Sequence, residues 1–455
     1  MVQATREAAQ LPRASDLARG RLSNARGLKL SPYWWEAAPR LASTPQPSIP
    51  RTVDIAIVGS GYTGLSAALT LARRGRSVLV LERDVVGFGA STRNGGQVGA
   101  GSQKLSVAKL AGLGGEQAAH ELLREGTRIY EFLQHVVTAE KIDCHLRRCG
   151  RFRGAMRPEH YDQMAHDLGA VSKITGLEFF MVPPSEVHTE IGSDIFFGGA
   201  VLPKDSSIHP ALYHAGLSDR AREAGALVCG GAGVRAITRD GNAWQLETAA
   251  GPVKASDVIL AANGYIGGLN PELKPRIVPV GSAMIATAPI PEDLYRRLLP
   301  NDRVYGNTAR VFSYFRGAPG ETRIIFGGRV DRLRKGSSPR AYGHLARDMI
   351  RFFPDLADVP ITHAWDGLLA MTNDGVPHIG RTRDGLYFAL GYCGNAGIAR
   401  GTYFGHKVAL KVLGDPDGRT AFDDLKFPAY PFHVLARPMV PIVESWMSLR
   451  DRWNF

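Results

Sequence analysis

Cysteine is scarce in this chain. Only 4 of the 455 residues are Cys, and their spacing shows neither a CxxC pair nor the even framework of secreted disulfide-rich domains. Cys144, His145 and Cys149 lie close together, but a second pair of ligands at zinc spacing is absent. The scarcity therefore predicts a reducing, cytoplasmic compartment and no metal site.

Long apolar runs are also missing. No run approaches the roughly 18 residues that span a bilayer, and the first residues contain no hydrophobic signal core. We therefore expect a soluble chain without a membrane-spanning segment.

The sequence also lacks clusters of positive charge. The formal net charge is +12, yet the Lys and Arg residues form no run of five or six and do not alternate with aromatic residues. This pattern favours a solvated basic surface and no nucleic-acid partner. It leaves an RNA-associated or nucleotide-sensing module as an alternative from a different functional class.

Glycine, in contrast, is abundant, with 52 residues, which indicates many tight turns and close backbone approaches. A chain of this length exceeds the size of a single core, so we expect two or three lobes. Residues 53–58 form an apolar run typical of a buried parallel strand. A helix over residues 64–74 and a strand over residues 77–81 would complete a βαβ unit.

Three glycines lie between this first strand and the first helix, in the order Gly-Ser-Gly-Tyr-Thr-Gly. Gly59 permits the tight turn, Gly61 lets a pyrophosphate approach the backbone, and Gly64 lets the helix pack closely on the strand. Tyr62 and Thr63 lie between the last two glycines, directly before the helix, whose N-terminus favours the negative charge of a pyrophosphate. All five residues are assigned to a dinucleotide site.

An acidic residue ends the second strand, as such a site requires. Glu82 lies where a carboxylate accepts hydrogen bonds from the ribose hydroxyls and disfavours a 2′-phosphate. Arg83 follows it and is assigned to the same site. The strand, the glycine turn, the helix and the acid together predict dinucleotide binding.

A second glycine-rich stretch favours FAD over NAD as the ligand. Residues 87–97 are mostly small, as needed where backbone lies along a flat ring system and a pyrophosphate. From this stretch we assign to the cofactor site Ala90, Ser91, Arg93, Asn94, Gly95, Gly96 and Gln97.

In this stretch the sequence resembles the D-amino-acid oxidase superfamily of FAD enzymes. Within that superfamily it is similar to the glycine and sarcosine oxidases and, most of all, to the γ-glutamylputrescine oxidase-like amine oxidoreductases. The resemblance runs from about Tyr33 to the end of the chain. Besides residues 87–97 it includes residues 206–210, 225–234, 261–264, 365–367, 374–380 and 391–401.

The resemblance implies further contacts with the cofactor. Val234 corresponds to the valine whose backbone holds adenine, and Ala262 and Gly264 belong to the strand end that closes over the dinucleotide. The last flavin-contacting section contributes Gly394, Asn395, Gly397 and Ile398. These four would open a helix whose free N–H groups stabilise the negative charge that develops on the reduced flavin.

Two departures from the family pattern bear on the chemistry. Relatives with covalently bound flavin carry a histidine in the section equivalent to residues 90–97, or a cysteine near residues 369–372. This chain has neither, so we expect non-covalent FAD. Sarcosine-oxidase-type relatives place an oxygen-activating lysine on the strand where this chain has Ile325. The final electron acceptor is therefore either O2 or a quinone or other carrier.

The implied reaction is the oxidation of the C–N bond of an amine or amino acid. A hydride passes from the substrate to flavin N5, and the resulting imine hydrolyses to a carbonyl product and an amine or ammonia. Tyr314, Arg316 and Arg329 are the candidate catalytic and substrate-binding residues, because a guanidinium pairs with a carboxylate and an aromatic ring can face a cationic amine. The alternative is a membrane-associated flavin dehydrogenase of an imino acid, of the proline or pipecolate type, that reduces a quinone.

The expected fold is α/β, with a Rossmann-like FAD-binding domain interleaved with a substrate domain built on an antiparallel sheet. Residues 51–110, 200–275 and 360–415 are assigned to the FAD-binding domain, and residues 111–199 and 276–359 to the substrate domain. Residues 1–50 are an N-terminal extension, of which about the first thirty are expected to be poorly ordered.

Residues 416–455 are a C-terminal extension with an amphipathic helix. Ile442, Trp446, Leu449 and Trp453 fall on one face of this helix. We expect that face to pack against the body. Peripheral contact with the inner face of the membrane is the alternative.

Overall fold

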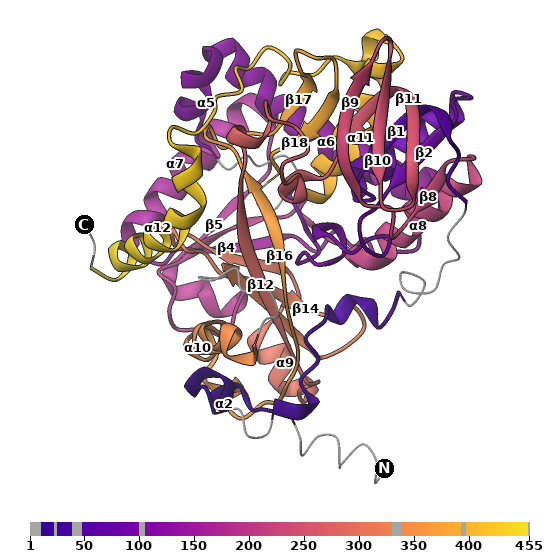
Figure 1. Cartoon of the computed structure of the whole chain (residues 1–455). Coiled ribbons are helices and arrows are strands. Elements are labelled where there is room, and N and C mark those ends of the chain that lie inside the picture. Colours follow the sequence, from indigo (N-terminus) through magenta and orange to yellow (C-terminus); the bar gives the residue numbers. More distant parts are fainter. Residues whose placement is uncertain are drawn as a thin grey trace.

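The computed structural model describes residues 11–21, 25–38, 48–99, 105–329, 338–392 and 397–453. Two eight-stranded sheets organise these residues, one at the upper right of Figure 1 and one through the middle of the molecule. This arrangement confirms the expected α/β fold with two sheets.

The first sheet is built around a buried parallel strand. β1 (Thr52–Val58) pairs in parallel with β2 (Val78–Leu81) on one side and with β11 (Gly251–Leu260) on the other. The other strands are β8 (Leu227–Cys229) beside β2, β18 (Tyr387–Leu390) and β17 (His378–Arg381) beyond β11, and the hairpin of β9 (Val234–Asp240) and β10 (Ala243–Thr248). All four residues of β2 are buried, as expected for a strand covered on both faces.

Three helices pack together on this sheet. α4 (Tyr62–Arg73) follows β1 directly, and α8 (Pro210–Glu223) and α11 (Gly397–Val412) lie against it. α11 packs closely on α4 because Gly405 has no side chain. A Cβ at this position would lie 2.3 Å from the carbonyl oxygen of Thr63. The βαβ unit predicted from the sequence is therefore present, with its helix beginning two residues earlier.

The second sheet is antiparallel except for one parallel pair, β13 with β4. In spatial order its strands are β16 (Ile361–Met371), β12 (Val278–Thr287), β15 (Ile324–Arg329), β14 (Tyr314–Gly317), β13 (Val304–Asn307), β4 (Arg151–Gly154), β6 (Gly199–Leu202) and β5 (Phe180–Val182). A two-stranded ladder of β3 (Gln97–Val98) and β7 (Ser206–Ser207) lies apart from both sheets.

Several strands differ from the sequence-based predictions. β16 belongs to the second sheet, although residues 360–415 were assigned to the FAD-binding domain. The sequence of residues 195–197 favours a strand, but these residues form none, and β6 begins at Gly199. The sequence of residues 309–315 also favours a strand, and the strand that forms there is β14, which is shifted toward the C-terminus.

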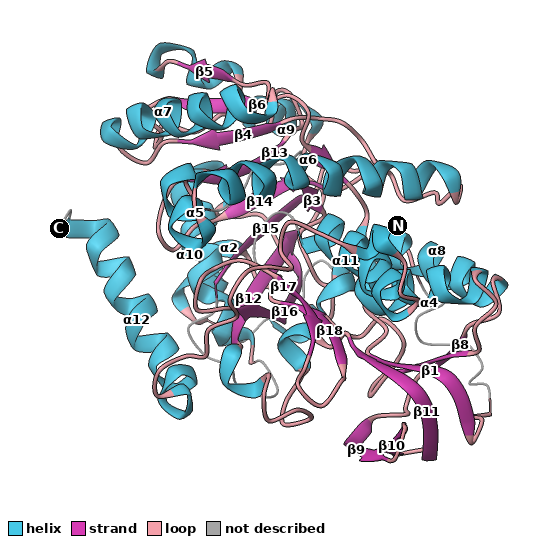
Figure 2. Cartoon of the chain, turned by 90° about the horizontal axis from the view of Figure 1, so that it is seen from above, coloured by secondary structure: helices cyan, strands magenta, loops and turns pink. Residues whose placement is uncertain are grey.

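The helices around the second sheet are α5 (Val107–Gly114), α6 (Glu116–Ala139), α7 (Pro158–Thr175), α9 (Glu292–Leu298) and α10 (Gly343–Phe352). α6 contacts both α7 and α11, so it bridges the two lobes, and Figure 2 shows it running across the molecule. Its buried leucine, isoleucine and valine residues recur at helical spacing.

Part of the N-terminal extension belongs to the second core. α2 (Ala14–Arg19) packs on α10 at the bottom of Figure 1, with Leu17 fully buried. Leu28 lies in the same core. The prediction of poor order is therefore wrong for these residues. It relied on the frequent arginines and overlooked the short apolar repeat at Ala14, Leu17 and Ala18.

The C-terminal helix, α12 (His433–Trp453), lies at the periphery in Figure 2. It touches β12, but a row of apolar side chains stays 40–77% exposed, namely Val434, Leu435, Met439, Ile442, Val443, Trp446 and Leu449. Of the face expected to pack against the body, Ile442, Trp446 and Leu449 are therefore largely uncovered, and the Trp453 side chain lies outside the described part of the structure. Among the described residues, no helix has the length and apolarity needed to cross a bilayer.

Candidate active site

The glycine turn between β1 and α4 has the geometry of a pyrophosphate-binding loop. Gly59 has a φ of 107°, and a Cβ there would lie 3.0 Å from the carbonyl oxygen of Ala261. A Cβ on Gly64 would lie 2.0 Å from the carbonyl oxygen of Gly59. Only glycine fits at both positions, so the turn is tight and the N-terminus of α4, which favours an anion, lies at the cavity described below.

A cavity of about 390 Å³ extends from this turn to the second sheet. Of the residues assigned to the cofactor, those that line it are Gly59, Gly61, Tyr62, Thr63, Glu82, Arg83, Ala90, Ser91, Arg93, Asn94, Gly95, Gln97, Val234, Ala262, Gly397 and Ile398. Residues far apart in the sequence thus meet around one space.

Three glycines assigned to the cofactor site do not line the cavity. Each lies instead against a neighbouring backbone carbonyl, where a side chain would not fit. Gly64 allows close helix packing, and Gly96, with a φ of 63°, faces the carbonyl oxygen of Ile208. Gly264 lies against Leu369 of β16, where a Cβ would be 2.7 Å from the carbonyl oxygen. Gly394 and Asn395 lie outside the described residues.

Glu82 is already part of a hydrogen-bond network at the ribose position. Its Oε2 accepts from the backbone N–H of Ser60 at 3.0 Å and from the Ser60 hydroxyl at 2.7 Å, and its Oε1 accepts from the N–H of Asp84 at 3.2 Å. These bonds fix the carboxylate at the end of β2, where it faces the cavity.

The glycine-rich loop at residues 87–97 is held by its own polar side chains. The Asn94 amide donates to the carbonyl oxygens of Ala90 and Ser91 at 3.1 and 2.9 Å, and its oxygen accepts from Gly96 N–H at 2.9 Å. The Ser91 hydroxyl accepts from Tyr62 N–H at 3.0 Å, which ties the loop to the start of α4. The conformation of the loop is therefore held by hydrogen bonds within the protein.

Arg93 brings a positive charge to the wall of the cavity. Its guanidinium lies 4.3 Å from the centre of the Phe88 ring and donates to the carbonyl oxygens of Phe88 and Asp366. Burial lowers the pKa of this guanidinium below its ordinary value. The charge is thus held in place by backbone oxygens and can face an anionic group of the ligand.

The far end of the cavity is formed by the second sheet. Its lining there is mostly apolar, with Val280, Phe312, Gly328, Leu369 and Met371. Tyr314 of β14 and Ser282 of β12 also line it and join their hydroxyl groups at 2.9 Å. Burial raises the pKa of Tyr314 to about 12, so this phenol stays protonated near neutral pH.

Arg316 does not join Tyr314 at the cavity. Arg316 is buried away from the cavity lining, and its Nη1 donates to the carbonyl oxygens of Gly96 and Ile208, each at 2.9 Å. Its pKa falls to about 10 because of this burial. Arg316 therefore links the backbone of the loop at residues 87–97 to that of Ile208. Arg329 ends β15, and its side chain lies outside the described part of the structure.

Sequence reasoning did not single out two polar residues of the cavity. Ser282 lies in a β-strand without any motif. Tyr392 lies within the glycine-rich stretch 391–401 and is only 6% exposed. Its hydroxyl faces Thr63 but completes no hydrogen bond within the described residues, as expected for a group that awaits a polar ligand.

The fold and the site define a two-lobed dinucleotide-binding protein. A glycine turn, a strand-end carboxylate, a hydrogen-bonded second loop and the Tyr392 hydroxyl surround a cavity that continues under a second sheet. FAD fits this set of groups, because the turn and helix N-terminus suit its pyrophosphate and the loop at residues 87–97 leaves room for flat rings.

Comparisons with known proteins agree with this class. The family model described as FAD dependent oxidoreductase (DAO) matches residues 54–409. The γ-glutamylputrescine oxidoreductase of Escherichia coli strain K12 is 31% identical over 88% of this chain and 93% of its own length. The probable oxidoreductase OrdL of Rhizobium meliloti is 30% identical over 92% of this chain and 97% of its own length.

A solved structure is similar over the same extent. Glycine oxidase from Geobacillus kaustophilus superposes with a TM-score of 0.68 at 22% identity, and the match covers 84% of this chain and 99% of that chain. The chain therefore belongs to the DAO family of FAD-dependent oxidoreductases, and its cofactor is FAD.

Proposed function

We propose that this enzyme oxidises the carbon–nitrogen bond of a small amine or amino acid, giving an imine that hydrolyses to a carbonyl product. The observation that carries the proposal is one continuous cavity, which is lined at one end by the dinucleotide motif and at the other by β12, β14 and β16. Two relatives, γ-glutamylputrescine oxidoreductase and glycine oxidase, are named for molecules with an amino group.

The residues at the far end of the cavity suit a neutral amine. When bound, FAD supplies the two-electron oxidising power of the reaction. Phe312, Leu369 and Met371 make an apolar wall that excludes water and disfavours the charged ammonium form of a substrate. The Tyr314 hydroxyl stays protonated, so it orients the amine through a hydrogen bond and does not act as a base.

The cavity also supports non-covalent binding of FAD. Across the described lining residues there is no histidine or cysteine that could form a bond to the flavin. The cofactor is then retained by hydrogen bonds, charge and ring contacts alone.

We also propose that the reduced enzyme passes its electrons to a quinone or another carrier and not to O2. Ile325 stands where sarcosine-oxidase-type relatives place an oxygen-activating lysine, and it is fully buried in β15. No lysine lines the cavity in the part of the chain that the structure describes. A lysine ammonium beside the flavin ring favours electron transfer to O2 because the product is an anion. Arg83 and Arg93 also line the cavity, but in this proposal they face the anionic part of the cofactor, so the lack of a lysine slows that step.

The test is an anaerobic titration of the purified enzyme with a panel of amines and amino acids. Loss of the visible flavin absorption with one class of amine, slow recovery in air and rapid recovery with a quinone are expected. Full colour in the presence of every amine would refute amine oxidation. Immediate recovery in air would instead show an oxidase and refute only the choice of acceptor.

Peripheral membrane contact through α12 is a second proposal, favoured by its exposed apolar side chains. The sequence of the helix also contains three arginines, Arg437, Arg450 and Arg452, against two acidic residues. An apolar face flanked by cationic residues suits an anionic bilayer surface. The likeness to L-proline dehydrogenase from P. horikoshii, with a TM-score of 0.66 at 20% identity, concerns the fold alone.

A further inference from the structure

Three consecutive residues of the flavin-binding loop are held by three tryptophans that lie outside it. The indole N–H of Trp35 donates to the Thr92 hydroxyl, that of Trp365 to the carbonyl oxygen of Arg93, and that of Trp34 to the carbonyl oxygen of Asn94. Each of these bonds is 2.8 Å long. The polar backbone of the loop is therefore satisfied from outside the dinucleotide-binding motif.

Two of these donors are deeply buried. Trp34 and Trp365 are 0% and 1% exposed and share one apolar cluster with Met284, Ile325 and Tyr314. The next loop residue, Gly95, rests on the Tyr314 ring, since a Cβ there would lie 2.9 Å from it. The loop and the substrate end of the cavity thus rest on the same cluster.

Trp34 and Trp35 belong to a short segment, residues 25–38, that we term the strap. Its 3-10 helix Tyr33–Trp35 carries both tryptophans. The strap is fastened to β16 at its start by backbone bonds from Lys29 to Thr362 and from Ala364 to Lys29, at 3.0 Å each. It is therefore paired with the second sheet and not only laid on it.

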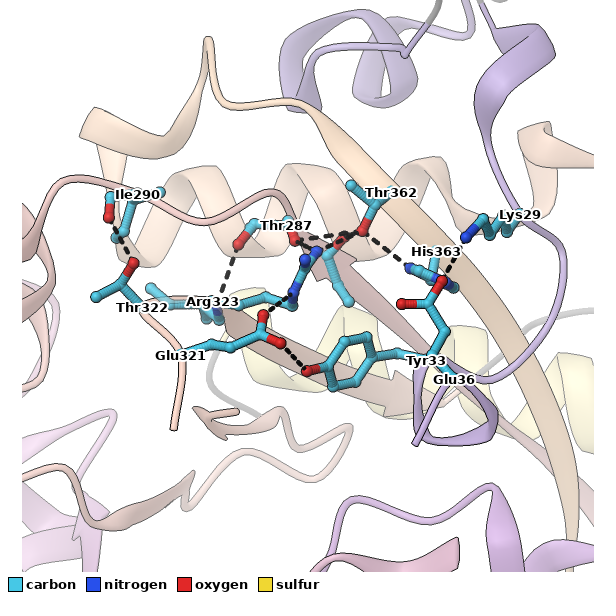
Figure 3. A network of polar contacts seen from close by, with 12 residues as sticks. Lys29, Tyr33, Glu36, Thr287, Ile290, Glu321, Thr322, Arg323, Thr362 and His363 are labelled. Carbon is cyan, nitrogen blue, oxygen red and sulfur yellow. Dashed lines mark hydrogen bonds and ion pairs between the residues drawn. The ribbon is translucent and has the colours of Figure 1, made fainter. Parts of the chain in front are cut away.

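A polar network fastens the other end of the strap (Figure 3). Glu36 accepts from Lys29 and lies 3.1 Å from Nε2 of the buried His363. The Tyr33 hydroxyl donates to Glu321 at 2.9 Å, and Glu321 pairs with Arg323, which also donates to the carbonyl oxygen of Thr287. The network ties the strap to β12, to β16 and to the Glu321–Arg323 segment that leads into β15.

We propose that Trp34, Trp35 and Trp365 are positioning residues for FAD. The strap and β16 fix the loop at residues 92–94 relative to the second sheet, and this sets where the flavin lies above Tyr314. Without the indole donors, the loop loses the bonds that define its position and must find them again on binding FAD. Both the affinity for FAD and the surroundings of the flavin then change.

The experiment replaces one indole at a time in the full-length enzyme. Trp34→Phe and Trp365→Phe each remove a buried N–H donor while an aromatic ring remains. We expect FAD to bind about tenfold more weakly, as for the loss of one buried hydrogen bond. The visible absorption and circular dichroism of the flavin at saturating FAD should also shift, which a loss of stability alone would not produce.

Trp244→Phe is the matched control. Trp244 is 1% exposed in β10, and its indole N–H has no hydrogen-bond partner among the described residues. This variant loses the same atoms from a core without losing a bond to the loop. It should bind FAD with unchanged affinity and an unchanged flavin spectrum.

Trp35→Phe keeps the proposal testable if the buried variants do not fold. Trp35 is partly exposed, and a phenylalanine can still stack below the Arg93 guanidinium, which lies 4.8 Å from the indole ring. We expect FAD to bind roughly two- to fivefold more weakly and the flavin spectrum to shift. FAD affinities and spectra equal to those of Trp244→Phe in the folded variants would overturn the proposal. No substrate is used, so failure of amine oxidation would not affect the result.

Discussion

The hydroxyl oxygens of Ser282 and Tyr314 lie 2.9 Å apart, on two strands that flank β15. This polar pair stands in the mostly apolar end of the cavity. Tyr314→Phe removes one hydroxyl and leaves the ring that supports Gly95. We expect kcat/KM for the amine to fall about tenfold with unchanged FAD affinity.

The matched control for that variant is Tyr305→Phe. Tyr305 is fully buried in the second core, and its hydroxyl accepts from Arg303 N–H away from the cavity lining. It should leave kcat/KM unchanged. Steady-state kinetics that show equal losses in both variants would mean that Tyr314 supports the fold and does not orient the substrate.

Removal of the Glu82 carboxylate should weaken FAD binding. In Glu82→Ala the three donors on Ser60 and Asp84 lose their charged acceptor, and the ribose loses its partner. We expect the Kd for FAD to rise by about 10- to 100-fold, as for loss of a charge-assisted hydrogen bond. Isothermal titration of the apoprotein measures this. Glu247→Ala, on the exposed side of β10, should leave the Kd unchanged.

Two buried histidines and one half-buried histidine should make the protein sensitive to mild acid. Burial lowers the pKa of His209, His363 and His406 from 6.5 to about 4 in each case, with Arg316 adding to the effect at His209 and Lys407 at His406. The folded protein therefore binds fewer protons than the unfolded chain between these values. The stability is fully present above pH 6.5 and is lost as the pH falls toward 4.

Denaturant unfolding at several pH values measures this loss. Each histidine contributes a slope of up to about 1.4 kcal/mol per pH unit within that window. Replacement of His406 by Asn should make the slope less steep. A free energy of unfolding that stays constant from pH 7 down through the window between 6.5 and about 4 would contradict the burial of these rings as neutral groups.

Acid precipitation should release FAD into the supernatant. The described lining of the cavity offers neither a histidine nor a cysteine, so denaturation breaks every contact with the cofactor. The supernatant should carry all of the flavin absorbance, and the pellet should be colourless. A yellow pellet, or a mass increase of the denatured chain equal to FAD, would show a covalent link.

The exposed face of α12 should bind anionic vesicles. Ile442→Asp places a charge in the apolar row, where the side chain is 65% exposed, so the fold should be unaffected. We expect sedimentation with phosphatidylglycerol vesicles to fall several-fold, because the inserted face becomes polar. Phe197→Asp changes an equally apolar and 48% exposed residue outside α12 and should sediment like the unchanged protein. Equal sedimentation of all three would exclude α12 as the contact.

The dinucleotide site was predictable because its signals are local. The turn at Gly59, Gly61 and Gly64 and the acid at Glu82 follow each other along one βαβ unit, and the backbone around Gly59 and Gly64 excludes other residues. The loop at residues 87–97 was found for the same reason.

The strap and the fate of Arg316 could not be predicted in this way. The bond from Trp365 to Arg93 spans 272 positions, and that from Trp34 to Asn94 spans 60, so no local pattern records them. Arg316 has the residue type of a carboxylate ligand, yet its partners are the carbonyl oxygens of Gly96 and Ile208. The side to which a strand residue points depends on pairing register, which the sequence does not state.

The interleaving of the two lobes has a consequence for biosynthesis. The pyrophosphate turn leaves the ribosome within the first 73 residues, but the β11 end and α11, which complete the same cavity, are synthesised much later. At ordinary rates of translation the interval to α11 is on the order of tens of seconds. The nascent chain therefore exposes half of a cofactor site throughout this time, and FAD can be captured only once nearly the whole polypeptide has been made.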